Sequence, residues 1–408
     1  MDESSSPTPA GAPLAVIPTG MLKIEASSAC QLRCPSCPTT TGATAAVIGQ
    51  SWLRLADFVK LVDDNPWVGR IELSNYGEAF LNPDLLEIFR HAYRRGVTLQ
   101  LANGVNLNHV REEVLEGLVQ YQVAFVNCSI DGATQGTYER YRVKGNLDRV
   151  LANIRRINDF KKARGSSLPQ LAWQFIAFGY NEDEIPAARQ MAQELGMEFR
   201  VKLNWDPSFA PTVNKDLVRA ASGTGAASRE EFREKNGGDY MEGLCMDLWA
   251  SPQVNWDGKM LGCCRNYWGD FGGNAFRDGL AASLNGEKRF YAIEMLRGRA
   301  PPRDDIPRTK CDIYAHRRQA KRWVVQPAAV ARKDIESLFA KTRDAAAIAQ
   351  SEGRMDDAAR MARILLQLRP DSAEALNMLE QAARIAGRED AARYFAGRVE
   401  KLGGSEME

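Results

Sequence analysis

The chain carries the sequence CQLRCPSC at residues 30–37, directly after the first strand that its pattern predicts. Cys30, Cys34 and Cys37 therefore form a C-x3-C-x2-C array on one short loop. Three thiolates so close together can hold three irons of a [4Fe–4S] cluster and leave the fourth iron open. An open coordination position distinguishes a reactive metal site from a structural one. The loop thus predicts a reactive cluster, and the alternatives are a zinc knuckle or an electron-transfer cluster.

The loop opens a long alternation of short β-rich runs and helical stretches that starts at Met21. Six strand and helix steps end near residue 205, and the strand-like runs are LKIEAS, RIELS, VTLQLA, VAFVNCSI, QLAWQFIAF and EFRVKLN. Such repetition gives a parallel sheet with right-handed crossovers, and six units can curve into a partial barrel. We predict an α/β fold with a partial (βα)6 TIM-like barrel at residues 20–205. Its chemistry belongs at the carboxyl ends of the strands.

The cysteine spacing, together with Pro35, Pro38 and the place of the loop after strand one, resembles the radical S-adenosylmethionine (radical SAM) superfamily. In that family the amino and carboxylate groups of S-adenosylmethionine chelate the open iron. An electron from the cluster then breaks the sulfonium bond and gives a 5′-deoxyadenosyl radical. The resemblance covers residues 20–325 and implies a [4Fe–4S] cluster, S-adenosylmethionine and an external electron donor such as flavodoxin or ferredoxin.

The sequence SNYGEAF follows the second predicted strand and resembles the family's glycine-glutamate motif. The resemblance implies that Gly77 permits close backbone approach and that Glu78 helps to hold the methionine amino group. Tyr76 and Ala79 depart from the more frequent Gly-Gly-Glu-Pro form, so the contacts around the methionyl group are left open. A plain turn is the alternative interpretation of the Gly-Glu pair.

Further polar residues follow the third and fourth predicted strands. The resemblance places Asn103 where the family commonly meets the cofactor, and Ser129 and Asp131 are candidates for cofactor contacts if their face lines the barrel interior. Asn103 begins an Asn-Gly pair that is otherwise an ordinary turn. Strand alternation puts Ser129 and Asp131 on one face and Cys128 on the other, where it would pack. Arg142 lies in a predicted helical stretch from Thr134 to about Lys162. Its guanidinium could bind the cofactor carboxylate in a bidentate manner; a solvated helix charge is the alternative.

A second cysteine set lies in a stretch dense in Trp, Gly, Asn and Asp, which suggests a small unit organised by metal. The spacing from Gly258 to Cys263 resembles the SPASM or twitch extensions of radical SAM enzymes. This resemblance implies an auxiliary domain at residues 244–325 with a second [4Fe–4S] cluster. Its expected ligands are Cys245, Cys263 and Cys311. A zinc-bound structural unit is the alternative.

The fourth ligand of the second cluster is left open. A twitch form often ends in a C-x2-C pair, but Tyr314 stands near the position where its last cysteine would be expected. Cys264, His316, the substrate or water could supply the ligand. We expect Cys264 not to bind the cluster, because two adjacent thiolates seldom point at one cluster without strain.

The C-terminal residues 343–408 are rich in Ala and Arg and repeat with a period of 34 positions, as Gly353 and Gly387 show. The period resembles tetratricopeptide helix pairs, and a plain Ala-rich helical hairpin is the alternative. We expect this repeat to be separable in stability from the barrel, since tandem helical pairs contact mainly their neighbours. The remaining predicted boundaries are a disordered tail at 1–19, a linker at 206–243 and a linker helix at 326–342.

Composition excludes several classes of partner. Lys and Arg total 53 and Asp and Glu total 52, so no global positive field exists to hold nucleic acid. No run of eighteen apolar residues and no basic-then-apolar leader is present, which predicts a cytoplasmic protein without a membrane partner. Eight cysteines without an export signal favour metal ligands over disulfides.

These observations favour a radical SAM enzyme that abstracts a hydrogen atom from a small natural product, such as a sugar, nucleoside or amino-acid derivative. A net oxidation assisted by the auxiliary cluster is the favoured outcome, although no motif specifies the reaction and no catalytic residue can be named. Peptide-modifying relatives often carry an additional N-terminal recognition unit, whereas the first barrel strand here begins near residue 21. The alternatives are a peptide or protein substrate recruited by the C-terminal repeat, and a non-catalytic electron carrier or scaffold.

Overall fold

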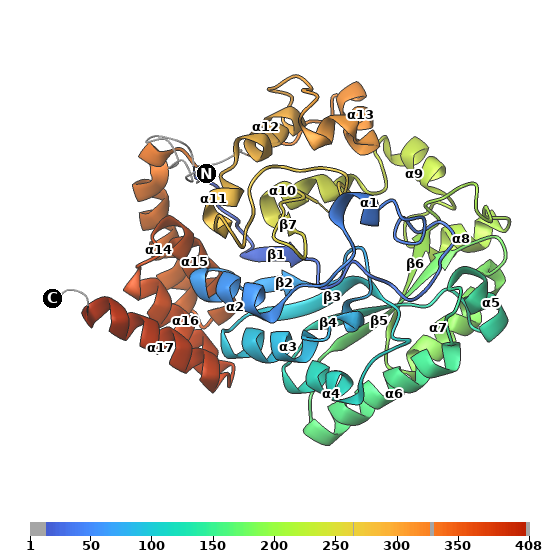
Figure 1. The fold of residues 1–408 in the computed structure, drawn as a ribbon, viewed down its shortest axis with the longest axis horizontal. Helices are drawn as coiled ribbons and strands as arrows, with labels where there is room; N and C mark the ends of the chain where they lie inside the picture. The colour runs from blue at the N-terminus through green and yellow to red at the C-terminus, as the bar shows by residue number, and fades with distance from the viewer. Residues whose placement is uncertain (1–13, 264, 327–329, 405–408) are drawn as a thin grey trace.

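The computed structural model describes residues 14–263, 265–326 and 330–404. Its centre is a curved sheet of seven strands in the order β6-β5-β4-β3-β2-β1-β7, and every pair is parallel (Figure 1). The strands are β1 (Met21–Ile24), β2 (Arg70–Glu72), β3 (Thr98–Val105), β4 (Phe125–Ser129), β5 (Gln170–Ala177), β6 (Glu198–Leu203) and β7 (Gln253–Val254). The first six follow one another in chain order, so the predicted α/β partial barrel is confirmed.

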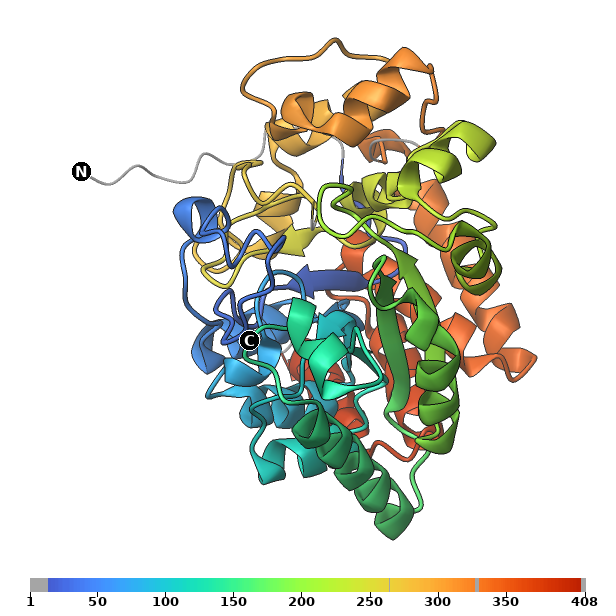
Figure 2. The same cartoon turned by 90° about the vertical axis from the view of Figure 1, so that its right-hand side faces the viewer.

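Helices connect these strands and cover the outer face of the sheet (Figures 1 and 2). They are α1 (Ala45–Ile48), α2 (Leu55–Asp64), η1 (Ala79–Leu81), α3 (Leu85–Arg94), α4 (Glu112–Gln120), α5 (Gln135–Tyr141), α6 (Leu147–Arg164), η2 (Glu182–Glu184) and α7 (Ile185–Glu194). The longest, α6, begins where the Asn146 side chain accepts a hydrogen bond from the Arg149 amide and ends at the left-handed Gly165. Its buried apolar face, which includes Ile154, packs into the barrel core.

Two local predictions in the barrel are wrong. The stretch from Thr134 to Lys162 is two helices, because Lys144 has a positive φ and a Cβ on Gly145 would lie 2.6 Å from the Tyr138 ring. The break leaves Arg142 at the C-terminal cap of α5 instead of on a helix face. Asn103 is inside β3 and not in a turn after it, next to a register shift between Leu101 and Val105.

The second cysteine region closes the β1 edge of the sheet. Its strand β7 was not predicted, and it pairs with β1 through the bond from the Glu25 amide to the Val254 carbonyl, 3.0 Å. A buried ion pair of 2.8 Å between Lys23 and Asp247 joins the same two regions. The helices are α8 (Lys215–Ala221), α9 (Arg229–Asn236), η3 (Glu242–Met246), α10 (Asp247–Ala250), α11 (Leu280–Leu284), α12 (Glu287–Leu296), η4 (Pro307–Lys310) and α13 (Asp312–Gln319). Because α8 and α9 lie within residues 206–243, that stretch is not an irregular linker.

The C-terminal region forms two helical hairpins beside α2 and α3 (Figure 1). Its helices are η5 (Arg332–Asp334), α14 (Ile335–Ser351), α15 (Met355–Leu368), α16 (Ala373–Ile385) and α17 (Glu389–Gly404), so helix starts 355 and 389 follow the 34-residue period. The Arg363 guanidinium donates to the carbonyls of Val68 and Gly96, both at 2.9 Å, at the amino-terminal end of the barrel. Phe395 packs against Gly96 in the same hydrophobic cluster as the barrel. The repeat contacts more than its neighbours, which removes the basis for the expected separability.

The predicted N-terminal tail is too long. Residues 1–13 lie outside the described residues, but Leu14 and Val330 exchange two backbone hydrogen bonds of 2.9 and 3.0 Å. Ile17 is fully buried, and its amide donates to Gln367 on α15 at 2.6 Å. Burial of apolar side chains therefore anchors residues 14–19 between the barrel and the C-terminal helices.

A membrane span is not among the features of this fold: no helix in the described ranges has both the length and the apolar character that crossing a bilayer requires.

Candidate active site

The cysteine loop lies at the carboxyl end of β1, as predicted. Cys34 is buried, whereas Cys30 and Cys37 are half-buried. The Cys37 amide donates to the Cys34 carbonyl at 3.1 Å, which folds the loop into a tight turn. Burial raises the pKa of Cys30 to about 12 and also raises that of Cys34. Burial therefore disfavours the thiolate forms of Cys30 and Cys34, and a positive charge close to the sulfurs favours them.

Among the residues that the structure describes, no group of three or more His, Cys, Asp or Glu side chains is arranged to hold a metal ion. A [4Fe–4S] cluster needs a different arrangement of ligands from a single metal ion, since each thiolate binds a different iron. Three thiols on one loop, beside a buried arginine and a close-packed glycine, have the donor chemistry that a [4Fe–4S] cluster uses.

Arg142 points from the break after α5 toward this loop. Its Nε donates to Oδ2 of the fully buried Asp131 at 2.6 Å, and its Nη1 lies 3.8 Å from the Cys34 sulfur. Burial opposes the charge, but Asp131 and Cys34 outweigh burial and raise the pKa of Arg142 well above its usual value. The second oxygen of Asp131 accepts from the Ile176 amide at 2.7 Å. Asp131 therefore positions Arg142, and both of its oxygens are already engaged by protein donors.

The Gly77–Glu78 pair packs directly on the cysteine loop. A Cβ on Gly77 would lie 2.1 Å from the Ser27 carbonyl oxygen, so only glycine fits there. The Glu78 amide donates to the Ala29 carbonyl at 2.7 Å, one residue before Cys30. The motif at the end of β2 thus supports the loop that carries the cysteines.

The Glu78 carboxylate is buried beneath the loop. It accepts hydrogen bonds from the Asn106 amide at 2.7 Å and the Phe80 amide at 3.3 Å. Burial raises its pKa to about 7. The Asn106 side-chain nitrogen lies 3.8 Å from the Cys30 sulfur, so Glu78 and Cys30 are linked through Asn106. Asn106 was not predicted, although it is two residues beyond the singled-out Asn-Gly pair.

Glu25 is a second buried carboxylate that the sequence interpretation missed. It stands directly after β1 and accepts hydrogen bonds from the Tyr76 amide at 3.0 Å and the Gly77 amide at 3.2 Å. Burial raises its pKa to about 8. Its position, a charged residue at the end of an apolar strand just before the cysteine loop, is the signal that could have found it.

The polar strand-end residues face the inside of the barrel. The Ser129 hydroxyl accepts from the Gln174 amide group at 3.4 Å, and Asn127 donates to the Gln174 oxygen at 2.9 Å. The Asn103 amide group donates to Asn75 at 2.6 Å. Cys128, on the other face of β4, is fully buried in the hydrophobic core, which confirms the predicted alternation.

The three cysteines of the second set come from separate segments and surround one arginine. Cys245, Cys263 and Cys311 are all buried, with exposed fractions of 1% or less. The Arg308 guanidinium lies 3.4 Å from the Cys263 sulfur and 4.0 Å from the Cys311 sulfur. Burial opposes its charge, yet the three cysteines outweigh burial and raise the pKa of Arg308 above its usual value. Sequence reasoning missed Arg308, which no motif marks.

The environment of Arg308 suits thiolates. The structure describes no carboxylate ion pair for this fully buried guanidinium, and a buried charge needs a partner of opposite sign. Sulfur is the partner that its two guanidinium contacts provide. The donor chemistry at this second set is therefore compatible with a cysteine-bound cluster.

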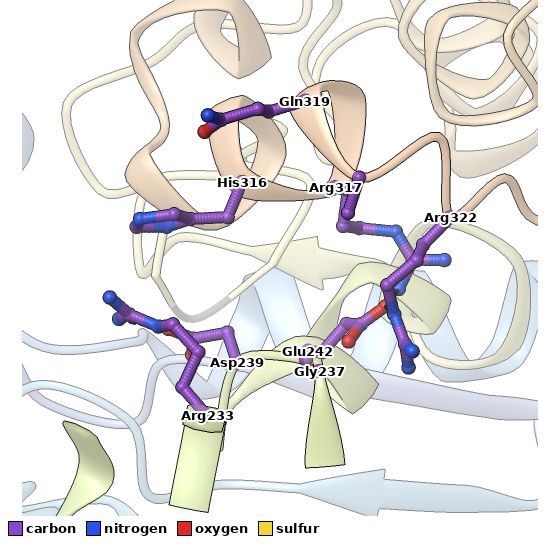
Figure 3. Close-up of a pocket in the computed structure, with 10 residues that line it drawn as sticks. Arg233, Gly237, Asp239, Glu242, His316, Arg317, Gln319 and Arg322 are labelled. Atoms are coloured by element: carbon purple, nitrogen blue, oxygen red, sulfur yellow. Dashed lines mark hydrogen bonds and ion pairs between the residues drawn. The ribbon is translucent and has the colours of Figure 1, made fainter. Parts of the chain in front are cut away.

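Of the two protein candidates for the fourth ligand of the second cluster, the structure describes His316 but not Cys264. Cys264 lies outside the described residues, so its expected non-participation stays a prediction. His316 is on α13 and lines a cavity of about 310 Å³ together with Arg233 and Asp239 (Figure 3). Its Nδ1 atom is buried without a hydrogen-bond partner among the described residues.

Tyr76 joins the two cysteine regions. Its hydroxyl donates to the Cys263 carbonyl at 3.3 Å, and its ring meets Tyr267 edge to face with a centroid distance of 5.9 Å. Tyr76 is one of the two residues that depart from the Gly-Gly-Glu-Pro form. The departure gives the Gly77–Glu78 segment a direct contact with the second cysteine set.

Comparison with known proteins agrees with this arrangement. Residues 24–184 match the sequence model described as the radical SAM superfamily. SuiB from Streptococcus suis, solved with S-adenosylmethionine, is 12% identical with a TM-score of 0.52 over 72% of this chain and 71% of that chain. Native anSMEcpe with bound AdoMet is 12% identical with a TM-score of 0.47, over 90% of this chain and 99% of that one. BtrN in complex with AdoMet and 2-DOIA is 14% identical with a TM-score of 0.39, over 72% and 90%.

The similarity to SuiB shows a common fold. A search of curated protein sequences finds no match to this chain.

Proposed function

We propose that this chain, which carries a radical SAM superfamily domain at residues 24–184, is a radical SAM enzyme acting on a small natural-product substrate. The observation that carries the proposal is the packing of Gly77 and Glu78 directly on the loop of Cys30, Cys34 and Cys37. This packing brings the three thiols, the close approach of the Gly77 backbone to the cysteine loop and the buried Glu78 carboxylate together at the carboxyl end of β1.

Members of this superfamily use a [4Fe–4S] cluster and S-adenosylmethionine. In our proposal Cys30, Cys34 and Cys37 hold the cluster, because three thiols leave one iron open. When bound, the cluster and S-adenosylmethionine together supply a 5′-deoxyadenosyl radical, which abstracts a hydrogen atom from the substrate. The protein contributes binding, orientation and exclusion of water.

The chain's own residues would hold the cofactor from several strand ends. Arg142, whose Nε is fixed by Asp131 and whose Nη1 lies near the Cys34 sulfur, can donate from Nη2 to the cofactor carboxylate. Glu78 is assigned to the methionine amino group, and Gly77 to the close backbone approach. Asn103 and Ser129 face the barrel interior, where they can accept or donate hydrogen bonds to the nucleoside part.

The second set, Cys245, Cys263 and Cys311, would hold an auxiliary [4Fe–4S] cluster in a unit resembling a SPASM or twitch domain. Its support is the convergence of three buried thiols around Arg308. A cluster at this place could accept an electron from the substrate side, which favours a net two-electron oxidation. The first cluster would receive its electron from an external flavodoxin or ferredoxin.

A small-molecule substrate is favoured over a peptide recruited by the C-terminal helices. Arg363 and Phe395 use one side of the tetratricopeptide-like repeat to dock on the barrel. That side is therefore not available to a partner.

The test uses the full chain, reconstituted with iron and sulfide without oxygen, reduced with dithionite and mixed with S-adenosylmethionine. We expect 5′-deoxyadenosine in the wild type and in Cys128→Ala, whose thiol packs in the core, but none in Cys34→Ala. Absence of 5′-deoxyadenosine in the wild type would instead support a non-catalytic electron carrier. Deuterium transfer from labelled candidate substrates into 5′-deoxyadenosine then identifies the substrate.

A further inference from the structure

A cavity of about 400 Å³ lies between the loop after β6, the start of α9 and the start of α13. One wall is the loop after β6, where Trp205 packs against the small hydrophobic cluster that includes Cys30 and Cys34. The opposite wall includes Arg265 and Asp312, and Asp312 directly follows Cys311 in the chain. The cavity is large enough for a small molecule.

Arg229, the first residue of α9, lines this cavity without an acidic partner. Its described hydrogen bond runs from Nε to the Leu203 carbonyl at 3.4 Å, and its guanidinium lies over the Tyr240 ring at 4.9 Å from the centroid. No ion pair is described for it. Arg229 is half-buried, and this burial lowers its pKa, which Tyr240, Asp239 and Asp312 oppose only in part. An anion placed against its outer nitrogens would offset the cost of this partial burial.

The other arginines around this cavity are already paired. Arg233 contacts Asp239 at 3.0 Å, and Arg265 contacts Asp312 at 2.9 Å.

The neighbouring cavity in Figure 3 shows the same paired state. Its Arg317 and Arg322 both bind Glu242 there. Arg229 therefore differs from these neighbours, because its two outer nitrogens are available to a planar or tetrahedral anion.

We propose that this cavity binds the substrate through an acidic group, a carboxylate or a phosphate, which the Arg229 guanidinium holds. This inference rests on the proposed function and narrows it. Trp205, Met241 and Ile313 provide apolar surface for the rest of the molecule. Acidic amino-acid derivatives and phosphorylated sugars or nucleosides fit this site, whereas neutral sugars leave the half-buried guanidinium without an anionic partner.

The experiment uses crystals of the reconstituted full chain soaked in selenate, whose selenium is located by anomalous scattering. We expect selenate at Arg229 in the wild type, its loss in Arg229→Met and its retention in Arg233→Met, which changes a paired arginine of the same cavity. Selenate only at surface positions, or equally bound in Arg229→Met, is an adventitious ion only and overturns the proposal. This readout does not require cleavage of S-adenosylmethionine, so it is independent of the proposed function.

Two further measurements define the ligand. Displacement of selenate by acetate indicates a carboxylate substrate, and displacement by inorganic phosphate alone indicates a phosphate ester. Both results support the proposal. The affinity for S-adenosylmethionine should be the same in Arg229→Met and in the wild type. A tenfold loss of that affinity would make Arg229 a cofactor contact and overturn the substrate assignment.

Discussion

The two cysteine sites differ in how the chain builds them and in what surrounds them. Cys30, Cys34 and Cys37 share one loop, and two of them are half-buried. Cys245, Cys263 and Cys311 come from distant segments and are buried to 1% exposure or less. The comparison teaches that a local motif makes an accessible site, whereas the fold itself assembles the closed one.

The arginine beside each site differs in the same way. Arg142 is paired with Asp131 at 2.6 Å and lies at the edge of its site. Arg308 lies between sulfurs, and the described residues give it no acidic partner. We therefore expect the first arginine to serve ligand binding and the second to set the charge of its site.

The largest expected effect is the loss of a whole cluster when one cysteine of either site is replaced. Cys34→Ala should abolish 5′-deoxyadenosine formation, because a site with two thiolates should not retain the reactive cluster. Cys245→Ala should remove about four irons per chain but keep the first cluster. Iron analysis and mass spectrometry of the nucleoside measure both. A wild-type rate of 5′-deoxyadenosine formation in Cys34→Ala would contradict the assignment of the reactive cluster to the first cysteine site.

The second prediction concerns the reduction potential of the auxiliary cluster. Arg308→Met should lower it, since hydrogen bonds and net charge at the sulfurs set cluster potentials. Arg308→Lys should lower it less, because the charge remains. Arg289→Lys is the matched control: Arg289 is also buried in this unit, but it bonds to backbone carbonyls. Redox titration followed by electron paramagnetic resonance gives the values. Equal potentials in the wild type and Arg308→Met would remove Arg308 from this role.

A third, smaller effect is expected at the cofactor. Glu78→Gln should weaken S-adenosylmethionine binding about tenfold, or ~1.4 kcal/mol, and leave the iron content unchanged. Glutamine keeps one acceptor oxygen, which can retain the shorter hydrogen bond from the Asn106 amide, but it loses the acceptor for the Phe80 amide. An unchanged iron content therefore checks that the loop stays folded while the charge is lost. Equilibrium dialysis with labelled cofactor measures the affinity. An unchanged dissociation constant would exclude Glu78 from the cofactor site.

The smallest effect involves a cation that serves neither site. Arg363→Ala should lower the free energy of unfolding by ~1–3 kcal/mol, because buried carbonyls lose their donors. Arg360→Ala is the control on the same helix, since its exposed side chain contacts only Asp357 in the described interactions; it should change by less than ~0.5 kcal/mol. Urea unfolding gives both values. Equal stabilities for the two variants would restore the view of a separable repeat.

The features that the sequence predicted are local patterns, whereas the features that it missed depend on contacts between distant segments. The cysteine loop, the six strands and the Gly77–Glu78 pair are local patterns, and the sequence predicted where they lie. The two-residue strand β7 has no periodicity to detect and exists because β1 has an open edge. Arg308 and Arg229 look like ordinary charges in the sequence. The burial of Arg308 and the cavity beside Arg229 distinguish them, and both features depend on segments far away in the chain.

The most direct test of the central claim is the electron paramagnetic resonance spectrum of the reduced full chain with and without S-adenosylmethionine. We expect two cluster signals, of which the one absent in Cys34→Ala shifts when the cofactor binds. The signal absent in Cys245→Ala should not shift. A spectrum that the cofactor leaves unchanged, or a shift confined to the signal that survives in Cys34→Ala, would contradict the claim that Cys30, Cys34 and Cys37 build the reactive site.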